Sequence, residues 1–254
     1  MNPCDIDEII SGKTYLLKDI NGNIVELVRL STYTFEFGEF KLQSELYPAF
    51  GKKLHNYFKI NSSIIQTDDR DYDRPKIKLL AENGFEVYYS KIIYTKDLDE
   101  HEFLFEDNFE YRSLKETGIE EFLQTYKLVL SEDPEGNVDP KTDFNDLVEY
   151  AGAGFDPGKW LLVMLNGKAI GVIMPQKYES KESIGGDMHI GIIPEERNMG
   201  YGKILFSKSL QLLKDDGIKK YIGSTNVNNI PMRKVFEFSG CKEWFKRFFY
   251  RAKT

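Results

Sequence analysis

The stretch from His189 to Phe206, HIGIIPEERNMGYGKILF, holds the residues whose types and spacing indicate chemistry. A β-branched run ended by proline predicts a strand followed by a turn. In that turn Arg197, Gly200 and Gly202 give R-x-x-G-x-G, where glycine permits positive φ and lets backbone N–H groups point into one concavity. The apolar spacing after the turn predicts a helix, whose first N–H groups favour an anion such as a pyrophosphate. We interpret residues 197–203 as a phosphate cradle; by themselves they also fit an ordinary strand–loop–helix connection.

Three further segments fall in a recognisable order around the cradle. Ile192 to Gly202 reads IIPEERNMGYG, asparagines follow within 226–229, and Phe236 to Cys241 reads FEFSGC. Upstream, residues 109–114 lead into an apolar-periodic helix. Over about residues 107 to 254 the chain thereby resembles the GNAT-type N-acetyltransferase superfamily. The signature of that family is V/I-x-P-E-x-R-x-x-G-x-G between a strand and a helix.

The fold class implied by this resemblance is α/β (α+β), a GNAT fold with a mixed, mostly antiparallel twisted sheet flanked by helices. Two strands, 160–165 and 169–174, flank Asn166-Gly167, which is a strong hairpin signal. The resemblance implies that the strand ending at Ile193 and the strand at 221–225 splay apart. Pantetheine would enter between them and bind the backbone of the first strand as an added strand does.

The resemblance implies acetyl-coenzyme A as co-substrate and an amine as acceptor, with no metal. Asn229 matches the family's asparagine that contacts the pantetheine arm, and a helix cap explains it equally well. The cofactor-binding residues implied are Ile190, Gly191, Ile192, Arg197, Asn198, Met199, Gly200, Tyr201, Gly202, Lys203, Asn229 and Phe236.

The implied reaction is direct attack of a deprotonated amine on the acetyl thioester in a ternary complex. It needs oriented substrates, oxyanion donors, a base and a source of a proton for the thiolate. Backbone N–H groups near Gly191 and Ile192 suit the oxyanion. For the base, His189 titrates in a suitable range, and Asp187 or Glu179 would act through water; a structural role for His189 stays open.

Phe236 departs from the family pattern, because a tyrosine commonly stands there as the acid for the leaving thiolate. Phenylalanine has no proton to donate. Either another group or water protonates the thiolate, or this copy binds acetyl-coenzyme A without the usual turnover. Cys241 is interpreted as a small buried hydrophobe and not as a nucleophile.

Composition limits the classes of protein. The 254 residues carry a net charge of −7, which opposes binding to nucleic acid, and no stretch is apolar enough to span a membrane. Only Cys4 and Cys241 are present, and the first residues show no secretory signal, so we expect a cytoplasmic protein without a disulfide framework.

The two halves of the chain repeat at a fixed offset. Pro231 minus Pro75 and Gly240 minus Gly84 both equal 156. A helix, a strand, a helix and an aromatic strand thus recur, although coincidental likeness of two α/β units is the alternative. We predict two domains, a degenerate, truncated GNAT-like copy at 1–104 and an acetyl-coenzyme A-binding copy at 105–254. The first copy has no cradle, because Lys41, Ser44 and Leu46 stand where the arginine and glycines would be.

The sequence therefore predicts an N-acetyltransferase that transfers an acetyl group from acetyl-coenzyme A to a primary amine of a small molecule or peptide. A different class stays open, a non-catalytic acyl-coenzyme A sensor or scaffold, because of Phe236 and the degenerate copy. A third class, an aminoacyl-tRNA-dependent transferase, would need a basic surface, and the net charge of −7 argues against it.

Overall fold

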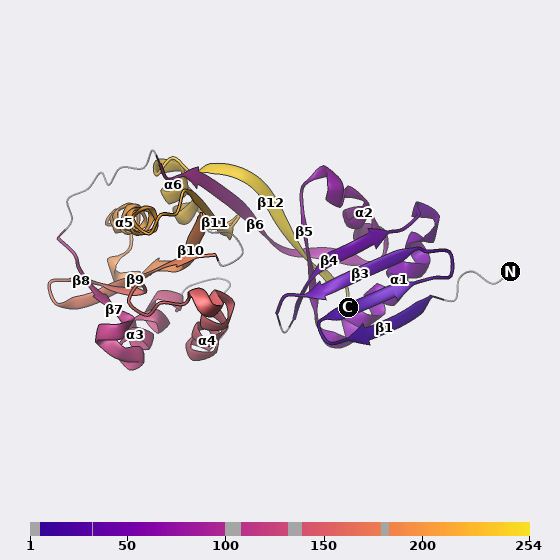
Figure 1. The fold of residues 1–254 in the computed structure, drawn as a ribbon, viewed down its shortest axis with the longest axis horizontal. Helices are drawn as coiled ribbons and strands as arrows, with labels where there is room; N and C mark the ends of the chain where they lie inside the picture. The colour runs from indigo at the N-terminus through magenta and orange to yellow at the C-terminus, as the bar shows by residue number, and fades with distance from the viewer. Residues whose placement is uncertain (1–5, 32, 100–107, 132–138, 179–182) are drawn as a thin grey trace. The chain divides into compact units, whose positions relative to one another are not determined.

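The chain forms two compact units, which are described separately. The computed structural model describes residues 6–31, 33–99, 108–131, 139–178 and 183–254. Unit 1 comprises residues 1–93 and 244–254, and unit 2 comprises residues 94–243 (Figure 1). Two strands, β6 (Phe85–Asp97) and β12 (Lys242–Ala252), are therefore each divided between the units. The domain limits at 1–104 and 105–254 stay a prediction.

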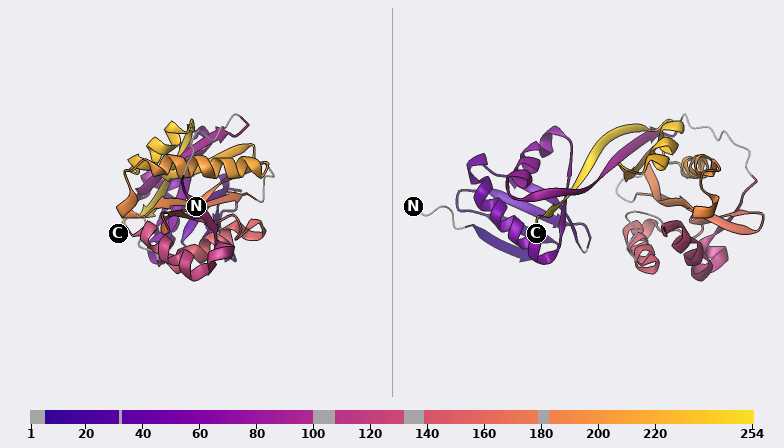
Figure 2. Two further views of the ribbon diagram at one scale, coloured as in Figure 1. Left: turned by 90° about the vertical axis from the view of Figure 1, so that its left-hand side faces the viewer. Right: turned by 180° about the vertical axis from the view of Figure 1, so that it is seen from behind.

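Unit 2 is a mixed sheet with helices on both faces, as predicted. The strand order is β11-β10-β9-β8-β7, antiparallel throughout except for the parallel pair β10 and β11. Helices α5 and α6 cover one face and helices α3 and α4 the other, which both views show (Figures 1 and 2). The elements are β7 (Glu110–Ser113), α3 (Leu114–Leu130), α4 (Pro140–Ala151), β8 (Leu161–Leu165), β9 (Lys168–Lys177), β10 (Ile184–Ile192), α5 (Tyr201–Asp215), β11 (Lys220–Asn226) and α6 (Ile230–Phe238).

Local signals explain where elements of unit 2 begin and turn. Ser113 and Glu116 form a capping box at the start of α3: the Glu116 N–H donates to Ser113 Oγ at 3.3 Å, and the Ser113 N–H donates to Glu116 Oε2 at 2.7 Å. The predicted hairpin between β8 and β9 is confirmed. Asn166 and Gly167 both have positive φ, 51° and 78°, which a type I′ turn requires.

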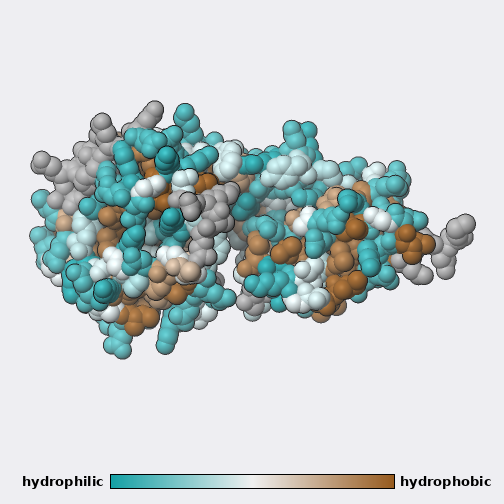
Figure 3. All heavy atoms as spheres, in the orientation of Figure 1, coloured by the Kyte–Doolittle hydropathy of each residue, from teal (hydrophilic) through white to brown (hydrophobic). Residues whose placement is uncertain are grey.

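Unit 1 is a sheet with helices packed against its core side only. Its strand order is β1-β2-β3-β4-β5-β12-β6. Tyr15 stacks on Tyr57 of the first helix with ring centroids 4.1 Å apart, and buried residues alternate with half-buried ones along β2 and β3. Figure 3 shows the other face, where hydrophobic and hydrophilic side chains are interspersed. The elements before β6 are β1 (Asp7–Ser11), β2 (Thr14–Lys18), β3 (Ile24–Arg29), β4 (Thr34–Lys41), α1 (Tyr47–Asn61), β5 (Ile64–Asp68) and α2 (Arg74–Glu82).

The internal repeat is confirmed at the level of elements. The series α1, β5, α2, β6 recurs as α5, β11, α6, β12, and α2 and α6 are offset by 156 residues at both ends. The pair β4 and β5 is parallel, like the pair β10 and β11. At Lys41, Ser44 and Leu46 no residue has positive φ, so the first copy lacks the cradle's backbone shape. Among the described residues of unit 1, no helices correspond to α3 and α4, which fits a truncated copy.

The last strand of the chain is held in unit 1 by backbone pairing and by an ion pair with a buried carboxylate. Residues Arg247 to Arg251 of β12 pair with β5, antiparallel. The Arg247 guanidinium donates to both oxygens of Asp68, with Nε to Oδ1 at 2.7 Å and Nη2 to Oδ2 at 3.2 Å. Asp68 is only 9% exposed, so loss of Arg247 would leave a buried carboxylate without its ion-pair partner.

Replacing Arg247 by alanine is expected to lower the free energy of unfolding by about 2–3 kcal/mol, because Asp68 is left charged and unpaired. The matched control is Arg251→Ala. Arg251 lies on the same strand as Arg247 and forms an exposed ion pair with Glu86, so its loss should change the free energy of unfolding by no more than about 0.5 kcal/mol. Urea denaturation of both variants measures the difference. Equal losses would show that the Asp68 pair is no stronger than a surface pair.

Candidate active site

The parallel strands β10 and β11 separate after two residue pairs. Only Ile184 pairs with Lys220 and Gly185 with Tyr221. Beyond Gly185, β10 stays paired with β9 on its other side as far as Ile192, and β11 continues to Asn226. The predicted splay is therefore confirmed. We call the space between residues 186–192 and 222–226 the opening.

A bulge in β10 decides which way the side chains beside the opening point. Asp187 is in register with Pro175 and Ile190 with Ile173, so one extra residue lies between the two pairs. In a regular strand Asp187 and His189 would share a face, whereas the extra residue places them on opposite faces. His189 packs edge-on against Tyr126 of α3, with ring centroids 5.2 Å apart, and the Asp187 carboxyl accepts a short hydrogen bond from Ser209 of α5.

The backbone of β10 leaves hydrogen-bonding groups at the opening. Ile193 donates its N–H to Ile170 of β9 at 2.9 Å. Because N–H directions alternate along an antiparallel pair, Gly191 also faces β9, and the N–H groups of Ile190 and Ile192 face the opening. The Ile192 carbonyl on the same side already accepts a hydrogen bond, because Arg197 Nε donates to it at 3.0 Å.

The turn after β10 has the backbone shape of an anion-binding site. Asn198 and Gly200 are left-handed, with φ of 65° and 83°, and a Cβ at Gly200 would meet nothing within 4 Å. Gly200 is the N-cap of α5 and no side chain caps it. The Lys203 N–H donates to Gly200 O at 3.2 Å, so the N–H groups of Tyr201 and Gly202 are the ones that the helix geometry leaves without an acceptor within the helix. Gly202 differs from the expectation: it lies inside α5 without positive φ, where a Cβ would sit 3.4 Å from Val235.

Arg197 holds this turn in place. Besides the bond to Ile192, its Nη2 donates to Val129 O at 3.1 Å, so the guanidinium joins the end of β10 to α3. Its backbone N–H donates to Pro194 O at 3.2 Å. An arginine at this position is therefore explained by its role in holding the turn against the end of β10 and α3.

Comparison with known proteins agrees with this geometry. Residues 120–240 match the acetyltransferase (GNAT) family. That segment belongs to the GNAT family. No curated protein matches the chain by sequence.

Solved structures show the same fold over nearly the whole chain. A GCN5-related N-acetyltransferase from Sphaerobacter thermophilus superposes with a TM-score of 0.68 at 12% identity, covering 96% of this chain and 82% of that one. A tandem GNAT protein from the clavulanic acid biosynthesis pathway gives 0.64 at 13% identity, covering 94% and 82%. A functionally unknown conserved protein from Staphylococcus epidermidis gives 0.62 at 10% identity, covering 100% and 96%. The tandem GNAT neighbour fits the repeat found here.

Phe236 of the GNAT segment lies in an aromatic cluster under α6. It is 1% exposed and stacks on Tyr94, with centroids 4.5 Å apart and planes at 19°. Phe206 meets it edge-on at 5.1 Å, and Tyr221 lies 6.2 Å away. Asn229 caps α6, since its side chain accepts the Met232 N–H at 3.1 Å, which accords with the cap explanation.

Other predicted residues of the GNAT site have less defined surroundings. Met199 is 64% exposed, Tyr201 meets Phe109 edge-on, and the Lys203 ammonium lies 4.0 Å from the ring centre of Phe238. Glu179, a predicted base, lies outside the described residues. Cys241 is buried, and burial raises the pKa of its thiol to about 12, so it is a poor nucleophile, as predicted.

Three polar side chains beside the opening were not anticipated from the sequence. Ser209 and Tyr221 surround the Asp187 carboxyl, and the Tyr178 hydroxyl donates to Ile222 O at 3.2 Å. They come from α5, from β11 and from the residue that follows β9, so no local motif joins them. Burial raises the pKa of the Asp187 carboxyl to about 7, against the opposing hydrogen bonds from Ser209 and Tyr221.

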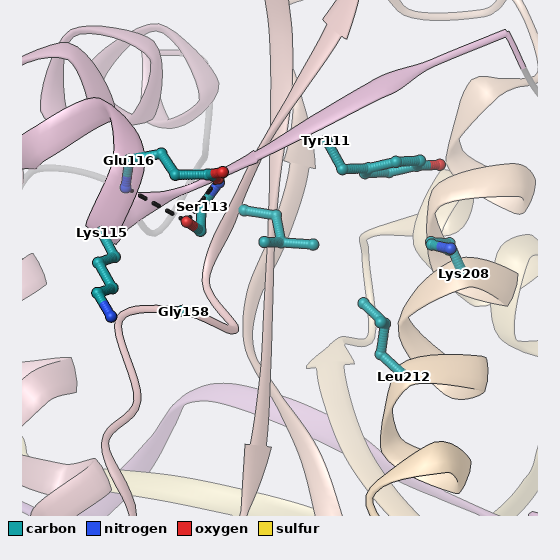
Figure 4. Close-up of a pocket in the computed structure, with 8 residues that line it drawn as sticks. Tyr111, Ser113, Lys115, Glu116, Gly158, Lys208 and Leu212 are labelled. Carbon is teal, nitrogen blue, oxygen red and sulfur yellow. Dashed lines mark hydrogen bonds between the residues drawn. The ribbon is translucent and has the colours of Figure 1, made fainter.

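A separate hollow lies at the β7 edge of the sheet of unit 2. Figure 4 shows Tyr111, Lys208 and Leu212 on one side and the start of α3, with Lys115, on the other. Its lining includes none of the predicted site residues. Within the described residues no helix is long and apolar enough to cross a membrane, and no cluster of potential metal ligands occurs. The cytoplasmic location stays a prediction.

The raised pKa of Asp187 predicts how stability depends on pH. A carboxyl that binds its proton more tightly in the folded state stabilises the fold most at low pH, and this contribution is lost as pH rises through about 7. Relative to Asp187→Asn, the wild type should therefore lose at most about 4 kcal/mol of unfolding free energy between pH 4 and 8. Denaturation at several pH values measures this. The exposed Asp156→Asn variant is the control, and its difference from wild type should stay constant over that range.

Proposed function

We propose that this protein is an acetyl-coenzyme A-dependent N-acetyltransferase acting on a primary amine of a small molecule or peptide. The observation that carries the proposal is the opening itself. It combines a strand edge with N–H groups at Ile190 and Ile192 and an uncapped helix start at left-handed Gly200. Family membership of residues 120–240 supports acyl transfer in general, and the donor and acceptor are proposed here.

In the proposed complex the pyrophosphate binds the first N–H groups of α5 at the phosphate cradle. The pantetheine arm then runs along β10 and pairs with its backbone at Ile190 and Ile192. The side chains of Met199, Tyr201, Lys203 and Asn229, with Asn198, border this path in the proposal. Gly191 faces β9, so we assign the oxyanion contact to the N–H groups of Ile190 and Ile192.

The amine attacks from the face of the sheet that carries His189. The His189 imidazole is half-buried between β10 and Tyr126, and we propose that it accepts the amine proton. The Asp187 carboxyl is on the other face, beneath α5, so His189 takes precedence over Asp187 as the base. The C–N bond forms, the C–S bond breaks, and coenzyme A leaves as a thiol once its sulfur gains a proton.

The test of this function is release of free thiol from acetyl-coenzyme A in the presence of a panel of small amines and peptides. Thiol release that depends on one amine supports the enzyme. Tight binding of acetyl-coenzyme A without turnover on any amine would instead favour the second candidate, a non-catalytic acyl-coenzyme A sensor, for which Phe236 in the usual place of a tyrosine is the specific observation.

Gly200→Val should weaken binding of acetyl-coenzyme A at least about tenfold, because a β-branched residue disfavours φ of 83° and its side chain enters the space proposed for phosphate. Gly217→Val is the matched control. Gly217 also has positive φ, 79°, and open space around a Cβ, but it follows the far end of α5. Calorimetric titration of both variants measures the affinity. If the two variants bind equally well, the pyrophosphate lies elsewhere.

His189→Gln is expected to lower kcat/KM by about 10²- to 10⁴-fold and to remove the rise of the rate on the acid side of the pH profile. The side chain keeps its approximate size, so the Tyr126 contact is largely retained. His55→Gln, in unit 1, is the control and should leave the profile unchanged. A profile that keeps its acid side in His189→Gln would mean that His189 has a structural role.

A further inference from the structure

We propose that Tyr221 donates the proton to the departing thiolate of coenzyme A, with Asp187 as the positioning residue behind it. This inference rests on the proposed function. It assigns the step for which the sequence offered no group, since Phe236 has no hydroxyl. The assignment follows from where the Tyr221 side chain lies relative to the opening.

The Tyr221 hydroxyl lies beside a residue of β11 that borders the opening. Tyr221 is the last residue of β11 that pairs with β10, and its side chain extends along β11 as far as Gly223. A Cβ at position 223 would collide with the Tyr221 hydroxyl, so glycine there leaves the space that the phenol occupies. The hydroxyl is thus beside a residue two positions beyond the last pair, where the two strands are already apart.

Asp187 faces this hydroxyl from the other strand. It lies two positions beyond Gly185 on β10, as Gly223 does beyond Tyr221 on β11. Ser209 donates to its Oδ1, while Oδ2 is shielded from solvent and makes no hydrogen bond to any described group. The Tyr221 hydroxyl and the Asp187 carboxyl each shift the pKa of the other, so the two groups are within interacting range.

The hydroxyls of the neighbouring tyrosines donate to other acceptors. The Tyr178 hydroxyl donates to Ile222 O at 3.2 Å, and the Tyr94 hydroxyl donates to Glu243 Oε1 at 3.2 Å. Tyr221 is therefore the buried phenol of this region whose hydroxyl interacts with a carboxyl that can itself hold a proton.

The bulge in β10 separates the proposed acid from the proposed base. His189 contacts α3 on one face of the sheet, and Asp187, with Tyr221, lies under α5 on the other. The amine adds to the carbonyl carbon from one face of the thioester plane, and the sulfur then leaves from the tetrahedral intermediate, so the nitrogen and the sulfur need separate proton-transfer groups. A base and an acid on different faces of the sheet provide two such groups.

The step balances as follows. The amine nitrogen forms the C–N bond and passes a proton to His189, and the C–S bond breaks with its electron pair on sulfur. Tyr221 gives its hydroxyl proton to sulfur and takes a proton from the Asp187 carboxyl. His189 then releases its proton to water and Asp187 regains one from water, so the net products are the amide and coenzyme A thiol.

The pH response of this pair depends on every titratable group that faces it. The Asp187 carboxyl is met by Ser209 of α5 and Tyr221 of β11, with Tyr178, which follows β9, and the Cys241 thiol nearby. Burial raises the pKa of both phenols and of the thiol, so none of them titrates near neutrality. Asp187 is the group in this cluster that changes charge between pH 6 and 8.

The first experiment compares Tyr221→Phe with Tyr178→Phe, a control that also removes one phenol hydroxyl near the opening. We expect Tyr221→Phe to lower kcat by about 10²- to 10⁴-fold with the KM for acetyl-coenzyme A nearly unchanged, and Tyr178→Phe to keep most of kcat. Asp187→Asn keeps the shape but cannot supply a proton, so the fall of kcat on the alkaline side of its pH profile should disappear. An unchanged kcat in Tyr221→Phe overturns the assignment.

The second experiment does not depend on turnover. A phenol that touches the sulfur should strengthen the binding of coenzyme A, because the thiol or thiolate accepts its hydrogen bond. It should contribute little to the binding of acetyl-coenzyme A. Tyr221→Phe is therefore expected to weaken coenzyme A about tenfold in calorimetric titration while acetyl-coenzyme A changes little. Equal changes for both ligands contradict the assignment.

The two arms separate the failure of this inference from the failure of the proposed function. If the wild type binds coenzyme A and no amine is acetylated, the N-acetyltransferase proposal fails, and the ratio of the two affinities in Tyr221→Phe still decides whether the phenol touches sulfur. If the wild type binds neither ligand, both proposals are overturned.

Discussion

The loss of pairing between β10 and β11 after Gly185 is the constraint on which the site depends. Two parallel strands that stay paired leave no free backbone between them, whereas strands that separate expose a row of N–H and C=O groups inside a sheet. Gly186 lies where they part, and a Cβ there would collide with Ile222 O and the Tyr178 hydroxyl. Gly186 on β10 and the phenol of Tyr178, which follows β9, thus set the width at which the opening begins.

The bulge in β10 adds chemistry to that opening. One extra residue between Asp187 and Ile190 turns His189 toward α3 and leaves the Asp187 carboxyl under α5. The two environments differ physically. The histidine is half-buried against an aromatic ring, and the carboxyl has an oxygen withdrawn from water, which favours its protonated form. Two groups that are two residues apart on one strand therefore lie in different environments.

The repeat shows which parts of the fold are needed for its frame and which for a ligand. Unit 1 keeps the parallel pair β4 and β5 and the helices α1 and α2, yet the turn before α1 has no left-handed residue. Its ion pair between Asp68 and Arg247 serves to hold β12. In unit 2 the corresponding turn keeps Asn198 and Gly200 left-handed and α5 uncapped. Within the described residues, the same framework thus has the backbone shape of the proposed phosphate cradle in unit 2 and lacks it in unit 1.

The sequence by itself determined the elements, the family and the turn. Periodicity, the Asn166-Gly167 pair and the spacing around Gly200 are local signals, because each reflects the backbone preference of a few adjacent residues. The assignment of positive φ to Gly202 was wrong, since the first turn of α5 already includes it. Only the tertiary structure placed Ser209 and Tyr221 around Asp187 and separated Asp187 from His189. Those relations depend on a bulge and on strand register, which are set by contacts between distant segments and not by neighbouring residues.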